Sequence, residues 1–243
     1  MRFSHRMLPI VASLALLLSP APARAATGPA GHWEGKIQIP DHELSFTVDL
    51  DQGSKGEWIG SLSITGPGSV EVPLIKIVVS GTSVQFVARL PGETFFTGTL
   101  SSDASTLAGK ASNAEGAVPF QLARNGDANV KVPPPSSVLS KDFEGTWEGA
   151  VESDGKVRRI VLKLSPAPDG TATALLISVD KGNLEIPVTT VTLQGKQLEL
   201  DARAVGGRYR GTLGANGDIA GEWSENTIHL PLTFKRADSK YWE

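Results

Sequence analysis

The residues that could carry acid–base chemistry in this 243-residue chain are two glutamate pairs, Glu34 with Glu71 and Glu148 with Glu185. Glycoside hydrolysis needs two such carboxyl groups on either side of the scissile bond. All four glutamates, however, alternate with apolar neighbours that must point into a core. They are expected to face outward, where they pair with an arginine of a neighbouring strand or stay solvated. No catalytic residue is predicted.

Histidines are too few and too scattered for a metal site. After residue 25 there are three, His32, His42 and His229, without His-x-His or His-x₃-His spacing, and the chain has no cysteine. A zinc site needs three or four nitrogen, sulfur or oxygen ligands. A Gly-x-Ser-x-Gly nucleophile elbow is also missing. The sequence therefore predicts no metal, no cofactor and no enzyme.

The chain contains one unit of about 95 residues twice. The first copy opens with Gly-His-Trp-Glu-Gly (31–35) and the second with Gly-Thr-Trp-Glu-Gly (145–149). The offset between the copies is 114 residues for most of the unit and 112 at its end, where Arg124 corresponds to Arg236. Two copies are too few, and the unit too long, for a solenoid of short repeats. We expect two tandem domains.

The organisation along the chain follows from composition. Residues 1–25 resemble a secretory signal peptide, with a basic start, an apolar run and small residues at a cleavage site near Ala25. Repeat 1 covers 31–125 and repeat 2 covers 143–237. Between them, 126–142 contains three consecutive prolines and is expected to be a semi-rigid linker. A short tail, 238–243, contains Tyr241 and Trp242.

Charge and hydropathy limit the partners. Removal of residues 1–25 takes three arginines from 23 basic residues, which leaves 20 against 26 acidic ones and a net charge of −6. A basic patch is absent, so nucleic acid is a poor candidate. After the signal peptide no apolar stretch is long enough for a transmembrane helix. We expect a secreted or periplasmic protein.

Within each copy the dominant period is two. The stretch 44–50 alternates apolar and polar residues, and its counterpart 160–164 keeps the same phase. Short connections rich in Gly, Asn, Asp and Ser separate such segments, as in hairpins. The pattern slips in phase near Pro73 and near Pro187, which is typical of a bulge or a strand break. The sequence predicts an all-β fold with about eight antiparallel strands in each domain.

The end residues of each copy favour a closed sheet. Trp33 and Arg124 both fall on the inward phase, on the first and last strands, and Trp147 and Arg236 repeat this. An inward arginine needs a partner, because a buried unpaired charge is costly. Stacking on the indole provides one and requires the two strands to meet. The alternative is that each arginine lies in water at a strand end.

Two resemblances follow from these residues. The Gly-x-Trp of the first strand with a basic residue on the last resembles the calycin pattern, which includes the lipocalins. That resemblance implies up-and-down barrels that bind small apolar ligands. Nearly all of each copy is also similar to an uncharacterised secreted bacterial β-domain often found ahead of α/β-hydrolase domains, in the run 145–236 especially. Neither copy is followed by a hydrolase sequence here, so this resemblance implies a fold and a compartment but no reaction.

The predicted fold is therefore two tandem calycin-like β-barrels, and the predicted function is binding. An eight-stranded barrel is either filled by side chains or holds one small ligand, and the sequence leaves both open. If there is a pocket, its expected lining is Phe46, Trp58, Phe86, Phe96, Leu200, Tyr209 and Trp223. The partner would be a small apolar molecule or an envelope protein. The alternatives are an interaction module with solid barrels and, third, a hydrolase accessory or an enzyme.

Overall fold

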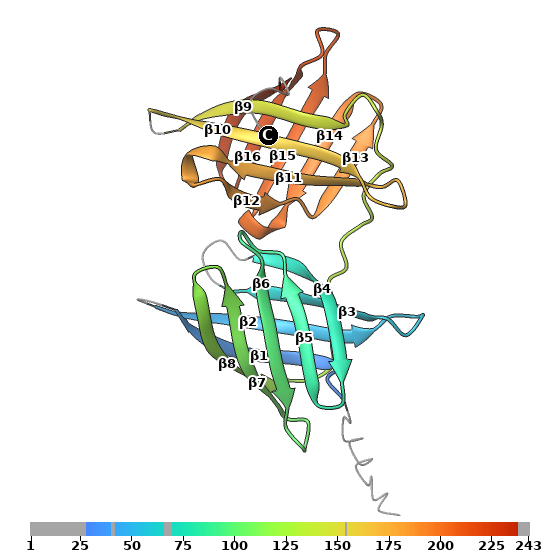
Figure 1. The fold of residues 1–243 in the computed structure, drawn as a ribbon, viewed down its shortest axis with the longest axis vertical. Coiled ribbons are helices and arrows are strands. Elements are labelled where there is room, and N and C mark those ends of the chain that lie inside the picture. Colours follow the sequence, from blue (N-terminus) through green and yellow to red (C-terminus); the bar gives the residue numbers. More distant parts are fainter. Residues whose placement is uncertain (1–27, 40–41, 66–69, 154, 238–243) are drawn as a thin grey trace, which may run out of the picture.

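The computed structural model describes residues 28–39, 42–65, 70–153 and 155–237. The signal peptide predicted for 1–25 and the tail 238–243 lie outside them. The described chain forms two β-structures in succession, joined by one extended segment (Figure 1). Among the described residues, no helix has the length and hydropathy needed to cross a membrane.

Repeat 1 is a closed barrel in which each strand pairs antiparallel with the next and the last pairs with the first. Its eight strands are β1 (Gly31–Ile39), β2 (His42–Gln52), β3 (Trp58–Ile64), β4 (Val70–Ser80), β5 (Ser83–Ala88), β6 (Thr94–Leu100), β7 (Thr106–Asn113) and β8 (Gly116–Arg124). The predicted up-and-down order and strand number are confirmed for this copy.

Repeat 2 is a nine-stranded antiparallel sheet that curls in the same way. Its strands are β9 (Gly145–Ser153), β10 (Lys156–Pro166), β11 (Ala172–Ser178), β12 (Leu184–Pro187), β13 (Thr190–Gln194), β14 (Gln197–Ala202), β15 (Gly207–Leu213), β16 (Ile219–Glu225) and β17 (Ile228–Arg236). Two short 3₁₀ helices, η1 (Val179–Lys181) and η2 (Arg203–Val205), interrupt the connections.

The extra strand of repeat 2 comes from the phase slip at the proline. In repeat 1, β4 stays continuous: it pairs with β3 up to Pro73 and with β5 from Leu74, and a bulge follows where Lys76 has φ of 52°. In repeat 2 the same stretch breaks after Pro187, so that β12 pairs only with β11 and β13 only with β14. The predicted irregularity is thus a bulge in one copy and a break in the other.

The linker contacts both domains. The backbone N–H of Asn129 donates to the Asp49 carboxylate and that of Lys131 to the Ser61 hydroxyl, on the outer face of the first barrel. Further on, Ser136 and Ser137 lie along the free edge of β13 and accept hydrogen bonds from its backbone N–H groups. Ser136–Leu139 therefore occupies the gap that the broken strand leaves, so an edge that would otherwise be unpaired is covered.

That gap is closed on its other side as well. The Ser137 backbone accepts from the N–H of Ala172, and the Leu139 N–H donates to the Gly170 carbonyl, while Val138 forms a bridge with Thr171. The linker thus completes the second barrel between β11 and β13. Its prolines suit this role because the segment bonds mainly through the serines beside them.

Each barrel is fastened at one end by a tryptophan and an arginine. The Arg124 guanidinium carbon lies 4.3 Å from the centre of the Trp33 ring, and that of Arg236 lies 4.4 Å from the Trp147 ring. Both indoles are fully buried. Trp33 is paired in register with Arg124 across β1 and β8, so the stack joins the first and last strands, as its counterpart joins β9 and β17.

The same pairs also hold the segment that enters the first strand. The indole N–H of Trp33 donates to the Pro29 carbonyl at 2.9 Å, and the Arg124 guanidinium donates to the carbonyls of Gly28, Ala30 and Ala104. In repeat 2, Trp147 donates to Phe143. Arg236 donates to the carbonyls of Asp142 and Glu144 in the same way. The entering segment thereby closes one end of each barrel.

Replacing Arg124 with alanine should destabilise the first barrel. The change removes the indole stack, worth about 0.5–2 kcal/mol, and leaves two partly buried carbonyl groups without a charged donor, so we expect a loss of about 2 kcal/mol or more. Urea unfolding followed by circular dichroism measures this loss. Arg210→Ala is the matched control, because Arg210 is two-thirds exposed and its pairing with Glu199 should contribute about 0.5 kcal/mol at most. Superimposable curves for Arg124→Ala and the wild type would contradict the role.

Candidate functional site

An apolar pocket opens in each barrel at the end opposite the tryptophan–arginine stack. Mouth 1, of about 340 Å³, lies among β1, β2, β3, β7, β8 and the β5–β6 turn, over a floor formed by Ile37, Phe46, Leu62, Phe96 and Ala111. Mouth 2, also about 340 Å³, lies among β9–β12, β16, β17 and the two 3₁₀ helices. Its apolar lining includes Val151, Ile160, Leu176, Ile186, Val205, Trp223 and Leu230.

The two mouths are equivalent positions of the repeat. Ile37 corresponds to Val151 and Leu62 to Leu176 at the offset of 114, and Ala111 corresponds to Trp223 at the offset of 112. Divergence has changed the size and charge of individual side chains but has kept an apolar opening at the same end. Volumes near 300 Å³ are at the lower limit of small-molecule sites.

Beneath mouth 1 the barrel is packed with aromatic rings. Phe86 stacks on Phe96 with 4.8 Å between ring centres, while Phe120 meets Phe96 edge-on at 5.5 Å and Phe46 at 6.4 Å. Such geometries add about 0.5–1.5 kcal/mol per pair beyond the burial of the rings. The pocket is therefore confined to the open end, and the rest of the interior is core.

The sequence-predicted lining residues of repeat 1 divide between pocket and core. Phe46 and Phe96 line mouth 1. Phe86 lies behind Phe96 and is buried in the core. Trp58 points inward but at the start of β3, near the stacked end, and packs against the core there. It is not among the residues that line either mouth.

Of the three lining residues that the sequence predicted for repeat 2, only Trp223 lines the pocket. Leu200 is fully buried in the core. Tyr209 is buried too, and its hydroxyl lies 3.0 Å from the Ile219 carbonyl oxygen and 3.2 Å from that of Leu232. Burial raises the pKa of this hydroxyl. Tyr209 therefore braces two strands and does not supply the polar handle that the sequence suggested for a ligand.

Residues of the mouth rims were missed by the sequence prediction. Arg158 lines mouth 2 where repeat 1 has Leu44, and Glu225 lines it where repeat 1 has Asn113. Lys181, on η1, is a second cation at this rim. The signal was available: Arg158 falls on the inward phase of β10, in a strand whose other inward residues are apolar.

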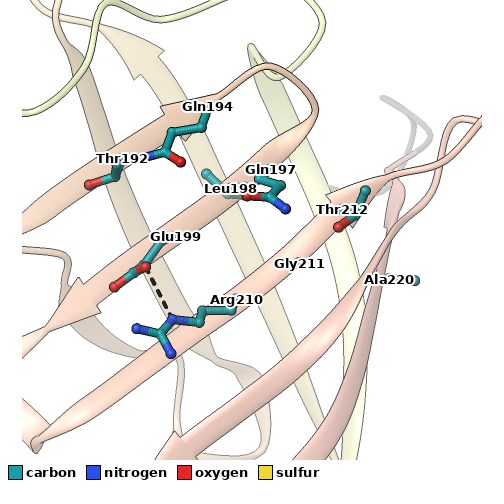
Figure 2. A pocket seen from close by; sticks show the side chains of 9 residues that line it. All are labelled: Thr192, Gln194, Gln197, Leu198, Glu199, Arg210, Gly211, Thr212 and Ala220. Carbon is teal, nitrogen blue, oxygen red and sulfur yellow. Dashed lines mark hydrogen bonds and ion pairs between the residues drawn. The ribbon is translucent and has the colours of Figure 1, made fainter.

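A polar groove of about 270 Å³ crosses the outer face of repeat 2. Figure 2 shows its side chains projecting from β13, β14 and β15, and Gly211 and Ala220 also line the groove. The Glu199 carboxylate accepts from Arg210 at 3.1 Å and also pairs with Arg208 at 3.3 Å. The Glu199 carboxylate is thus already bound by two arginines, and none of the residues that line the groove is aromatic, so the groove offers a ligand few groups to bind.

A charged cleft of about 590 Å³ lies where the two domains meet. Arg203 of η2 pairs with Asp201 at 3.0 Å and with Glu71 of the first barrel at 3.4 Å. Its neighbour Ala204 packs against the core of the first barrel. The sequence-based pairing of Glu71 with an arginine is therefore a contact between domains, and Glu71 is not free to act with Glu34.

Glu34 belongs to a separate cluster under the linker. One ring nitrogen of His32 lies 2.8 Å from Asp49 and the other 3.1 Å from Glu34, which also accepts from the Asn125 side chain. Burial lowers the pKa of His32, but the hydrogen bonds and charges of Asp49 and then Glu34 outweigh it, so that the pKa is raised above 6.5. With Asp49 also holding the linker, the cluster is structural.

Within the described segments, no group of three or more His, Asp or Glu side chains is arranged to hold a metal ion. The histidine cluster contains one imidazole and two carboxylates, but both ring nitrogens already contact those carboxylates. The His42 side chain lies outside what the structure describes.

Comparison with known proteins leaves the family open. No family model and no curated protein matches the chain. A protein of unknown function from the DUF3598 family of Nostoc punctiforme is 14% identical, with 86% of this chain and 96% of that one covered, at a TM-score of 0.24. A Bacteroides fragilis protein described as a "putative outer membrane protein" is 13% identical, with coverages of 85% and 95%, at a TM-score of 0.27. Likenesses this distant carry no argument about function.

His32→Gln should weaken the first barrel more in mild acid than in base. Because the folded pKa is raised, protonated His32 stabilises the fold fully below pH 6.5, and this contribution fades as the pH rises through the folded value. Urea midpoints at about pH 5.5 and about pH 9 test the difference, with the carboxylates ionised at both. His229→Gln is the control, since His229 pairs with Glu222 on an exposed surface. A pH-independent effect of His32→Gln would refute the charge-based role.

Proposed function

We propose that the chain is a secreted or periplasmic, non-enzymatic binding protein in which each barrel mouth holds a small apolar molecule. The observation that carries the proposal is the retention of an apolar opening at equivalent positions of two diverged copies. We also propose that both copies are tandem members of the secreted β-domain family that they resemble.

The physical case rests on exposed apolar surface. Protein interiors are close-packed, and a folded domain gains little from leaving an apolar hollow open to water. A ligand that covered about 200 Å² of such surface would gain roughly 5 kcal/mol from the hydrophobic effect. After the cost of association, dissociation constants from micromolar to sub-millimolar are expected.

In repeat 1, the two glutamates that were candidates for acid–base chemistry are bonded to other groups. Glu34 is bonded to His32 and Asn125, and Glu71 to Arg203 of the other domain. These two carboxylates therefore serve the linker and the domain contact. Catalysis by the pair would need both to be turned toward one substrate.

The second candidate is an interaction module that acts through its outer surface. The observation in its favour is exposed apolar side chains on the outside of repeat 1, with Phe95 46% exposed and Val78 55% exposed. The tail with Tyr241 and Trp242, which the sequence suggested for this role, lies outside the described residues. A protein without ligand in either mouth would favour this candidate.

Blocking each mouth with a larger side chain should remove one binding site. Val118→Trp on β8 narrows mouth 1, and Ile186→Trp on β12 narrows mouth 2, because each adds a large ring to the apolar lining. Titration with the uncharged fluorescent probe N-phenyl-1-naphthylamine should show two sites in the wild type, one in each variant and none in the double variant.

Gln121→Trp on β8 and Glu185→Trp on β12 are the matched controls. Both positions are exposed, lie on the same strands as the blocked residues and do not line a mouth. The controls should keep two sites. Probe binding that survives in the double variant, or that is absent from the wild type, would contradict the proposal.

A further inference from the structure

Arg158 is an inward-facing arginine at the mouth of an apolar barrel. On β10 its side chain shares the inward phase with Ile160, Leu162 and Leu164, which are partly or fully buried. It is half-buried itself and lines mouth 2. The equivalent residue of repeat 1 is Leu44, so the repeat architecture does not require a charge at this position.

One acidic residue beside this strand, Asp180, is bonded to Arg159 and not to Arg158. Asp180 on η1 is 2.6 Å from the guanidinium of Arg159, the outward neighbour of Arg158, and it also accepts from the Arg159 backbone N–H. These hydrogen bonds lower the pKa of Asp180. In the part of the chain that the structure describes, Arg158 itself forms no hydrogen bond or ion pair with a carboxylate, although Glu225 lines the same mouth.

Lys181 gives the rim a second cation, so mouth 2 combines two cations and one carboxylate above an apolar wall of Ile160, Ile186, Trp223 and Leu230. A half-buried guanidinium without a partner gains most from an anion that it can bind with two parallel hydrogen bonds. An apolar pocket below such a group matches a molecule with an apolar body and an anionic end.

We propose that mouth 2 binds a single-chain amphiphile with an anionic head group, whose head pairs with Arg158 and whose apolar part lies against Trp223 and Ile160. This inference rests on the proposed function and specifies the class of ligand for one of the two mouths. Among the described residues that line mouth 1 there is no cation, and Leu44 takes the place of Arg158, so mouth 1 takes an uncharged apolar ligand. The two copies thus differ in head-group selectivity and share an apolar body site.

The charge at the head group can be tested with decanoate, decanol and decyltrimethylammonium, which share one chain and differ in charge. Isothermal titration calorimetry of the full chain at low ionic strength should show one site that prefers decanoate over decanol by about tenfold or more, because a charge-assisted pair forms only with the anion. Arg158→Leu, which installs the residue of repeat 1, should remove this preference and keep the affinity for decanol.

Arg159→Leu is the control for charge alone. It removes an arginine adjacent in sequence that faces outward and is bonded to Asp180, and it should keep the preference for decanoate. Glu225→Gln should strengthen decanoate binding, because it removes a like charge from the rim. Circular dichroism of each variant confirms that it is folded.

The outcomes separate the two proposals. If neither decanoate nor decanol binds, the proposed function fails together with this inference. If both bind equally, or the cation binds best, the apolar site stands and the anionic head group is wrong. If decanoate binds only weakly while the chain sediments with phosphatidylglycerol vesicles in an Arg158-dependent way, the ligand is a membrane surface, and the single-chain proposal is overturned.

Discussion

The stack of an arginine on a buried indole is the contact on which each domain depends. It joins the first and last strands of each barrel, and through hydrogen bonds to carbonyl groups it also fixes the segment that enters the first strand. Gly31 must be glycine for this arrangement, since its φ is 153° and a Cβ there would lie 2.3 Å from a guanidinium nitrogen of Arg124. The Gly-x-Trp pattern and the distant arginine therefore form one unit.

Comparison of the two repeats distinguishes the contacts that both barrels share from those that only one barrel has. The stack recurs in both copies with nearly equal geometry, whereas positions under the linker differ. Asp49 and Ser61 in repeat 1 hold linker N–H groups, and their counterparts in repeat 2 are Lys163 and Leu175. At these two positions, side chains that can accept a hydrogen bond are present in the copy whose outer face the linker crosses, because a buried N–H group needs an acceptor.

Sequence alone predicted strand order, inward phase and the Trp33–Arg124 pairing, because period-two patterning fixes which face a side chain occupies. It could not fix the height of a side chain along the barrel axis. Trp58 and Phe46 share the inward phase, yet one lies near the stacked end and the other lines a mouth. Tyr209 is also inward, but its hydroxyl bonds to carbonyl groups of β16 and β17, which lie 10 and 23 residues further along the chain, and period-two patterning does not identify such partners. The contact of Ser136 and Ser137 with β13 could not be predicted from the sequence. A proline-rich composition indicates that a segment is stiff, but it does not indicate which residues the segment contacts.

The η2 turn makes the two mouths parts of one structure. Its three residues contact different groups: Arg203 pairs with Glu71 of the first barrel, Ala204 packs against the first core, and Val205 lines mouth 2. A ligand that pushes on Val205 must therefore act on a turn that is anchored in the other domain. Since the linker closes the second barrel while lying on the first, neither barrel keeps all of its contacts when the other moves. The tandem arrangement is thus one structure with two openings, and residues 44 and 158, which differ between the copies, line those openings.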